Sequence, residues 1–214
     1  VSGQDFPREK VVNSFREKAA GNALLTASIT KSATIPATSI LFNIDQKATL
    51  IEKDQSGPLL EVFVKVFDEA RGYCGTVGHV ARFESDLDEE GQFEGFKEAF
   101  KEISGREWEE RRTRYAFATV KKQIDEAYAR VNHIDPSAVN GILETYENNY
   151  SVSIEDFAES VKAWLDRQQS GYRLNFFVDE VGQFIGSNAK LMLNLQTIAE
   201  SLNTKCAGRS WIFV

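Results

Sequence analysis

Two kinds of hydrophobic pattern alternate along this chain. Mostly apolar residues fill three short runs at 39–44, 174–178 and 210–214. Short runs rich in β-branched and aromatic residues predict buried strands, because a strand covered on both faces needs apolar residues at successive positions. Elsewhere apolar residues recur every three or four positions, which is the spacing of amphipathic helices. The sequence therefore predicts a mixed α/β fold.

The helical spacing is strongest between the first and second runs. The helices predicted there cover 59–72, 79–87, 93–103, 106–131 and 153–165, and another covers 188–202 before the last strand. Ser153 and Asp156 have the spacing of a capping box, which favours a helix beginning there. Asp135 followed by Pro136 predicts a helix cap with a proline in the first turn.

The order of these elements predicts how the chain is organised. A connection between two parallel strands needs only about a dozen residues, so the long helical stretch is larger than a simple crossover. We therefore predict that residues 1–56 and 171–214 form an α/β core and that residues 57–170 form a helical insertion. The predicted order of elements is typical of a partly parallel sheet: a strand, the insertion, a second strand, a helix and a third strand.

The second predicted strand ends abruptly in two adjacent carboxylates, Asp179 and Glu180. The carboxyl ends of parallel strands open into the crevice where such sheets bind ligands. In P-loop nucleotide hydrolases an acid in this position holds magnesium and a neighbour positions the attacking water. We interpret the run as a Walker B strand. A buried strand that meets a solvated turn or a helix N-terminus gives the same pattern, so a structural role remains an alternative.

The phosphate-binding half of such a site is absent from the sequence. No Gly-x-x-x-x-Gly-Lys-Ser/Thr loop, whose backbone N–H groups and lysine cradle phosphates, occurs in the 214 residues. The chain begins at Val1 without a methionine and stops inside an apolar run, a pattern that we interpret as that of a fragment. We expect either a piece of a nucleotide hydrolase, inactive in isolation, or no such enzyme.

Composition narrows the class of protein. A hydrophobic content of 42% suffices for a buried core, whereas the net charge of −7 argues against contact with a nucleic-acid backbone. No apolar segment approaches the roughly 20 residues that span a bilayer, and no signal-peptide pattern occurs, so we expect a cytoplasmic protein. Cys74 and Cys206 predict neither a zinc site nor a disulfide framework.

Several other charged or aromatic residues have simple structural interpretations. We predict that the acidic run from Glu84 to Glu90 is an exposed helix end, with a protein-partner surface as the alternative. Trp108 is expected to anchor hydrophobic packing. Arg209 precedes the last strand and is expected to be solvated there rather than to reach a phosphate of another subunit.

Three segments also carry a resemblance to a known family. They read Ser-Ile-Leu-Phe-Asn-Ile-Asp at 39–45, Leu-Glu-Val-Phe-Val-Lys-Val-Phe-Asp-Glu at 60–69, and Phe-Val-Asp-Glu-Val-Gly-Gln-Phe-Ile-Gly at 177–186. These segments resemble parts of the large P-loop ATPase of bacteriophage exclusion (BREX) defence systems, the BrxC/PglY group. The last segment is the most specific of the three.

The resemblance implies a fold and a set of roles. The fold would be a truncated P-loop NTPase core of the AAA+/STAND-like type with a large helical insertion, and the phosphate loop would lie upstream of Val1. ATP and Mg²⁺ would be the cofactors of the parent chain. Asp179 would coordinate the magnesium and Glu180 would orient water. The resemblance assigns no role to other residues. From its position three residues after Glu180, Gln183 is expected to cap a helix, with contact to nucleotide or a neighbouring subunit as the alternative.

The resemblance also implies partners, which would be other BREX defence proteins or further copies of the chain in the bacterial cytoplasm. A second function remains open beside the ATPase. In that alternative the chain is a non-catalytic α/β scaffold or protein-interaction module, and the acid-tipped strand is merely structural.

Overall fold

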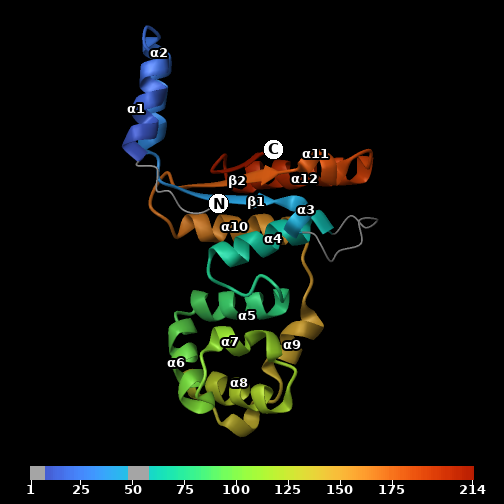
Figure 1. Cartoon of the computed structure of the whole chain (residues 1–214). Helices are drawn as coiled ribbons and strands as arrows, with labels where there is room; N and C mark the ends of the chain where they lie inside the picture. The colour runs from blue at the N-terminus through green and yellow to red at the C-terminus, as the bar shows by residue number, and fades with distance from the viewer. Residues whose placement is uncertain (1–7, 48–57) are drawn as a thin grey trace.

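Three parallel strands lie side by side in the order β1, β2, β3, in a computed structural model that describes residues 8–47 and 58–214. The chain is mostly helical around this small sheet, as Figure 1 shows. In chain order the elements are α1 (Arg8–Lys18), α2 (Ala23–Thr34), β1 (Ala37–Asn43), α3 (Ile44–Lys47), α4 (Pro58–Ala70), α5 (Gly78–Glu89), α6 (Phe93–Ser104), α7 (Trp108–Arg111), η1 (Arg112–Arg114), α8 (Ala118–Val131), η2 (Pro136–Ala138), α9 (Ile142–Asn149), α10 (Ile154–Asp166), β2 (Arg173–Asp179), α11 (Val181–Ile185), α12 (Ala189–Lys205) and β3 (Ser210–Phe213).

Local sequence signals determine several of these boundaries. The hydroxyl of Ser153 accepts a hydrogen bond from the Asp156 N–H at 3.0 Å, and the Asp156 carboxylate accepts one from the Ser153 N–H at 3.1 Å. This is the predicted capping box, and α10 begins immediately after it. Asn188 caps α12 in a related way, with its side-chain oxygen accepting from the N–H groups of Lys190 and Leu191.

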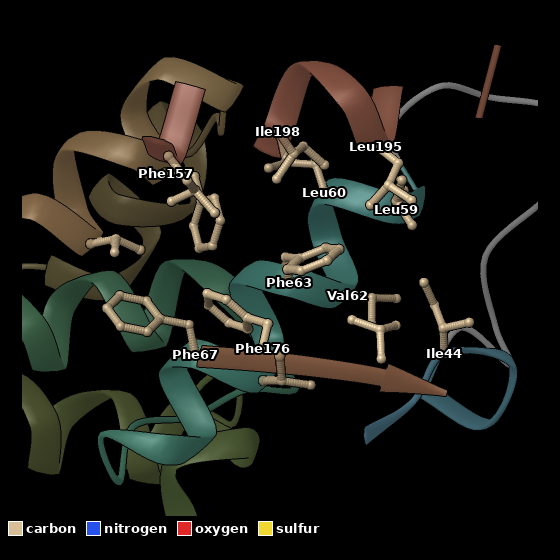
Figure 2. Close-up of a cluster of buried hydrophobic side chains, with 14 of the residues drawn as sticks. Ile44, Leu59, Leu60, Val62, Phe63, Phe67, Phe157, Phe176, Leu195 and Ile198 are labelled. Carbon is tan, nitrogen blue, oxygen red and sulfur yellow. The ribbon is translucent and has the colours of Figure 1, made fainter. Parts of the chain in front are cut away.

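One face of the sheet is covered by α4, α10 and α12. Phe63 of α4 lies at the centre of this packing, with its ring 5.6 Å from that of Phe42 and 5.3 Å from that of Phe176. Figure 2 shows Phe63 beside Phe176 of β2, with Leu195 of α12 nearby. Because these side chains are fully or almost fully buried, this cluster anchors the sheet to its three helices.

The other face of the sheet is not covered by the described residues, contrary to the expectation of strands buried on both faces. Side chains alternate between the faces of a strand, so Leu41, Phe177 and Phe213 all point away from the helical layer. The three residues are opposite one another in register. Their exposed fractions are 76%, 37% and 45%.

A second hydrophobic cluster lies apart from the sheet, within α5–α9. Its centre is aromatic, with the ring of Phe96 5.1 Å from both Phe83 and Trp108. Figure 1 shows these helices as a separate lobe beneath α4 and α10. We call the sheet with α4, α10 and α12 the sheet lobe, and α5–α9 the helical lobe.

The boundaries of the predicted insertion differ from those of the helical lobe. The predicted segment 57–170 includes α4 and α10, whose apolar faces belong to the cluster of the sheet lobe. Only the part of the segment between them forms the separate cluster. The physical reason is that a sheet face needs helices to cover it, and α4 and α10 supply that cover.

The helix predicted over 106–131 is wrong, because this segment is broken. It contains the short α7 and η1, an extended residue at Phe117 (φ −71°, ψ 128°), and then α8. The break allows Trp108 to be fully buried between Phe83 and Phe100. Tertiary packing of this one large side chain outweighs the helical spacing of the segment.

The helices α1 and α2 form a hairpin before β1. Figure 1 shows it projecting away from the sheet, on the side opposite α4 and α10. Asn22 caps α2 by accepting a hydrogen bond from the Leu25 N–H at 3.0 Å. The hairpin buries little, since α2 contributes no buried residue and α1 mainly contacts α2. Of the helices in residues 8–47 and 58–214, none is long and apolar enough to cross a membrane.

Candidate functional site

The two predicted acids lie at the carboxyl edge of the central strand. Asp179 is the last residue of β2 and is exposed to solvent. One of its carboxylate oxygens, Oδ1, accepts a hydrogen bond from the Glu180 N–H at 2.9 Å. No described residue hydrogen-bonds to the other oxygen, Oδ2, so the exposed carboxylate can still bind a ligand through it.

Glu180 has an unusual backbone conformation. Its φ of 63° and ψ of 20° lie in the left-handed region, which costs a residue with a side chain roughly 1–2 kcal/mol. The turn at Glu180 carries the chain from β2 directly into α11, where the Phe184 N–H donates to the Glu180 carbonyl at 3.0 Å. Backbone strain of this kind is concentrated at functional sites, which makes Glu180 a candidate functional residue.

The end of β1 meets the end of β2 at the same edge. Asn43 is opposite Asp179 in register, so their side chains share the uncovered face of the sheet. The Asn43 side-chain oxygen accepts a hydrogen bond from the Gln46 N–H at 3.1 Å and so caps α3. The short helix α3 packs on α11, and the buried Ile44 of α3 and Ile185 of α11 belong to the same hydrophobic cluster. Two short helices thus support both strand ends.

The remaining predicted residues are less closely linked to this edge. Gln183 is exposed within α11 rather than at a helix cap, and its side chain makes no hydrogen bond with the described residues. Arg209 lies at the opposite end of the sheet, where its guanidinium forms an ion pair with Asp166 at 2.5 Å and its Nε donates to the Cys206 carbonyl. These contacts give Arg209 a structural role at the start of β3.

The edge fits a partial magnesium site but not a complete one. Among the described residues there is no group of three or more His, Cys, Asp or Glu side chains positioned to hold a metal ion. Mg²⁺ keeps several waters and is commonly bound through one or two carboxylates together with substrate phosphates. Asp179, with its exposed carboxylate and unengaged Oδ2, suits that mode, whereas a metal bound only by protein side chains is not supported.

A cleft of about 670 Å³ lies elsewhere, between the sheet lobe and the helical lobe. It is bordered by α4, α5, α9 and α10, and none of its lining residues belongs to the carboxyl edge of the sheet. Beside it, Arg71 forms a buried ion pair with Asp68 at 2.5 Å and its guanidinium lies over the Phe67 ring at 4.2 Å. Burial raises the pKa of Asp68, while the Arg71 charge opposes that rise.

The sequence pattern did not identify Asn43 or the cleft. Asn43 becomes a neighbour of Asp179 only through the parallel pairing of β1 with β2. The polar end of the run at 39–44 was a signal for it, once the two strands are known to be adjacent. The cleft left no comparable signal, because its walls come from four helices that are distant in sequence.

Comparison with known proteins does not identify a family. No protein-family model matches this chain, and no solved structure matches it. The resemblance to the BREX ATPase therefore rests on the three sequence segments alone. The geometry at Asp179 and Glu180 is an independent basis for a functional proposal.

Proposed function

We propose that this chain is part of an ATP-hydrolysing P-loop protein and contributes its Walker B strand. The observation that carries the proposal is the position of Asp179 and Glu180, at the carboxyl edge of the central strand of a parallel sheet. Ligands of α/β proteins bind outside this edge. The core would then be of the truncated AAA+/STAND-like type, with the phosphate loop supplied by residues upstream of Val1.

In this mechanism each acid has a separate task. Magnesium bound with ATP supplies positive charge that offsets the charge developing on the transferred phosphoryl group. Asp179 would hold the ion, commonly through water, by its available Oδ2. Glu180 would accept a hydrogen bond from the attacking water and align it with the phosphorus atom. The left-handed turn at Glu180 supports this role, since it sets the point at the end of β2 from which the side chain extends.

The proposed setting is anti-phage defence of the BREX type, in the bacterial cytoplasm. The supporting observation is the sequence Phe-Val-Asp-Glu-Val-Gly-Gln-Phe-Ile-Gly at 177–186, which spans the strand end, the strained turn and α11. ATP hydrolysis would be coupled to conformational change in an assembly with other defence proteins or further copies. These 214 residues alone would not bind ATP tightly, because they lack the phosphate loop.

A non-catalytic interaction module is the second candidate. The uncovered sheet face and the projecting α1–α2 hairpin favour it, because exposed apolar surfaces of this kind are typical of contact sites. In that case Asp179 and Glu180 would serve only to end β2 and begin α11.

The test is Glu180→Gln in the natural chain extended upstream of Val1. We expect the variant to bind ATP with an affinity similar to that of the unchanged protein and to hydrolyse it at least about 100-fold more slowly, because the amide cannot take up a proton from water. Nucleotide affinity would be measured with a fluorescent ATP analogue and turnover by phosphate release. Glu155→Gln, on the exposed side of α10, is the matched control.

Two results would contradict the proposal. Unchanged turnover of Glu180→Gln would remove Glu180 from the chemistry. A natural upstream sequence that carries no Gly-x-x-x-x-Gly-Lys-Ser/Thr loop would remove the ATPase assignment altogether and leave the interaction module.

A further inference from the structure

Two apolar surfaces lie on the same side of the sheet, and no described residue covers either of them. The first is the open face of the sheet, which consists of Ser39, Leu41, Asn175, Phe177, Trp211 and Phe213. The second is the outer surface of the hairpin, which carries Val11, Phe15, Leu24 and Leu25. Parallel sheets are normally covered on both faces, so the open face is an incomplete layer.

The open face is apolar along the row of residues that crosses all three strands. The rings of Phe177 and Phe213 stack with their centroids 4.6 Å apart and their planes 9° from parallel. Leu41 extends this row onto β1, and Trp211 lies on the neighbouring row of β3. A continuous row across all three strands offers a helix a flat apolar surface to pack on.

The hairpin lacks a packing partner of its own. Phe15 and Leu24 are exposed by 59% and 84%, and both lie close to the turn that joins α1 to α2. Val11 is one helical turn before Phe15, so the two share a face of α1. Helices of 11 and 12 residues are marginally stable alone in water, and therefore this hairpin requires a surface to pack against.

The link between the hairpin and β1 holds the hairpin away from its own sheet. Only Ile35 and Pro36 separate α2 from β1, and Ile35 is extended with φ −73° and ψ 122°. Proline fixes one of its own backbone angles and disfavours helical conformations at the residue before it. Short, stiff hinges of this kind favour exchange of an element between two copies over closure within one copy.

We propose that two copies of this chain exchange their α1–α2 hairpins, so that each hairpin covers the open face of the other copy's sheet. Each copy contributes two apolar patches, the open sheet face and the hairpin surface, so the dimer contains four. With about 150–250 Å² for a large side chain such as an aromatic one, the exposed fractions of the apolar residues give roughly 350 Å² for each patch. Mutual cover would remove on the order of 1,400 Å² from water, which is within the range of specific protein interfaces.

Charge supports exchange between copies. Residues 9–34 carry four basic side chains, Lys10, Arg16, Lys18 and Lys31, and two acidic ones, whereas the whole chain carries a net charge of −7. The hairpin is thus a positively charged arm on a negatively charged body. Two copies approaching in this arrangement would bring opposite charges together, which accelerates association.

The first test measures the oligomeric state of the 214-residue chain by light scattering across a concentration series. We expect a dimer, and we expect Leu41→Ser and Phe15→Ser each to raise its dissociation constant at least tenfold. Leu193→Ser, on an exposed position of α12, is the matched control and should leave the dimer unchanged. Circular dichroism checks that every variant is folded. A monomer at all concentrations, or a dimer that resists both substitutions, would overturn the proposal.

The second test separates exchange from closure within one copy. A chain carrying Leu24→Cys is mixed with a chain carrying Leu41→Cys, and the mixture is oxidised. Exchange predicts a covalent dimer, because the two cysteines meet across the interface. Closure predicts no covalent dimer from the mixture and an internal crosslink in the double variant, which would sink the proposed exchange. Cys74 and Cys206 are buried and are present in every sample, so the oxidised unchanged chain shows how much crosslinking these two cysteines cause.

Discussion

At the scale of single residues, Glu84 is the clearest departure from the sequence pattern. It begins the acidic run predicted to be exposed, yet its side chain is fully buried in the helical lobe. Its carboxylate accepts hydrogen bonds from the Cys74 N–H at 2.5 Å, the Trp108 Nε1–H at 2.6 Å and Arg112 at 3.2 Å. The buried carboxylate of Glu84 is tolerated because these three donors hydrogen-bond to its two oxygens.

We predict that Glu84→Gln destabilises the protein by about 2–4 kcal/mol. The amide would turn its NH₂ group toward donors and would leave the Arg112 charge without its partner. The free energy of unfolding would be measured by urea titration. Glu89→Gln, in an exposed ion pair with Arg167, is the control and should cost less than about 0.5 kcal/mol. An equal loss for the two variants would contradict the structural role of Glu84.

The pKa of Glu84 adds a pH dependence to this prediction. Burial raises it from the ordinary value of 4.5, and the Cys74 N–H and the Arg112 charge partly oppose the rise. The folded protein therefore binds this proton more tightly than the unfolded chain does. Stability contributed by this group is present below pH 4.5 and is lost as the pH rises through the raised pKa. Glu84→Gln should remove that part of the slope of stability against pH.

At the scale of elements, the strand ends and the start of α10 lie close to the positions that the sequence predicts. The capping box at Ser153 and Asp156 determines where α10 begins, and α10 in turn supplies Phe157 and Val161 to the sheet lobe. The Ser153 hydrogen bonds also hold the pKa of Asp156 below its usual range. This helix start connects the helical lobe to the sheet lobe, since α10 follows α9 directly.

We predict that Ser153→Ala lowers the free energy of unfolding by about 1 kcal/mol, because the Asp156 N–H loses the hydroxyl that accepts its hydrogen bond. Ser153→Thr retains the hydroxyl and should lose less than half as much. Thermal unfolding followed by circular dichroism would compare the two variants. If both were as stable as the unchanged chain, the capping box would not contribute to the stability of α10.

At the scale of the whole molecule, the two hydrophobic clusters are separate bodies. Each has its own aromatic centre, around Phe63 in the sheet lobe and around Phe96 in the helical lobe, and the cleft separates them. The chain crosses between them twice, once after α4 and once before α10. Lobes joined by few contacts and a polar cleft are expected to move relative to each other.

We predict that residues 72–151, expressed alone, fold into a stable helical lobe, because their cluster includes no residue of the sheet lobe. Circular dichroism should show helix and a cooperative thermal transition. Phe96→Ala within this segment is the control and should abolish the transition, since removing a buried phenylalanine costs about 3–5 kcal/mol. A segment without a cooperative transition would show that the helical lobe depends on the sheet lobe.

The sequence by itself determined the features that depend on neighbouring residues. The strand ends near Asn43 and Asp179 and the starts of α10 and α12 all follow from local patterns, because caps and side-chain alternation act over a few residues. The adjacent acids at Asp179 and Glu180 were equally visible, although their role as a nucleotide site remains a prediction.

Only the tertiary structure decided which faces and charges are buried. The helical spacing at 106–131 gave no sign that the segment would break after the short α7, or that Trp108 in α7 would reach Glu84, which is 24 positions away. Nor did the apolar run at 174–178 show that Phe177 faces an uncovered side of the sheet, since an apolar residue looks the same in sequence whether or not a helix covers it. Burial depends on contacts between distant segments, and these are settled by the packing of the whole chain.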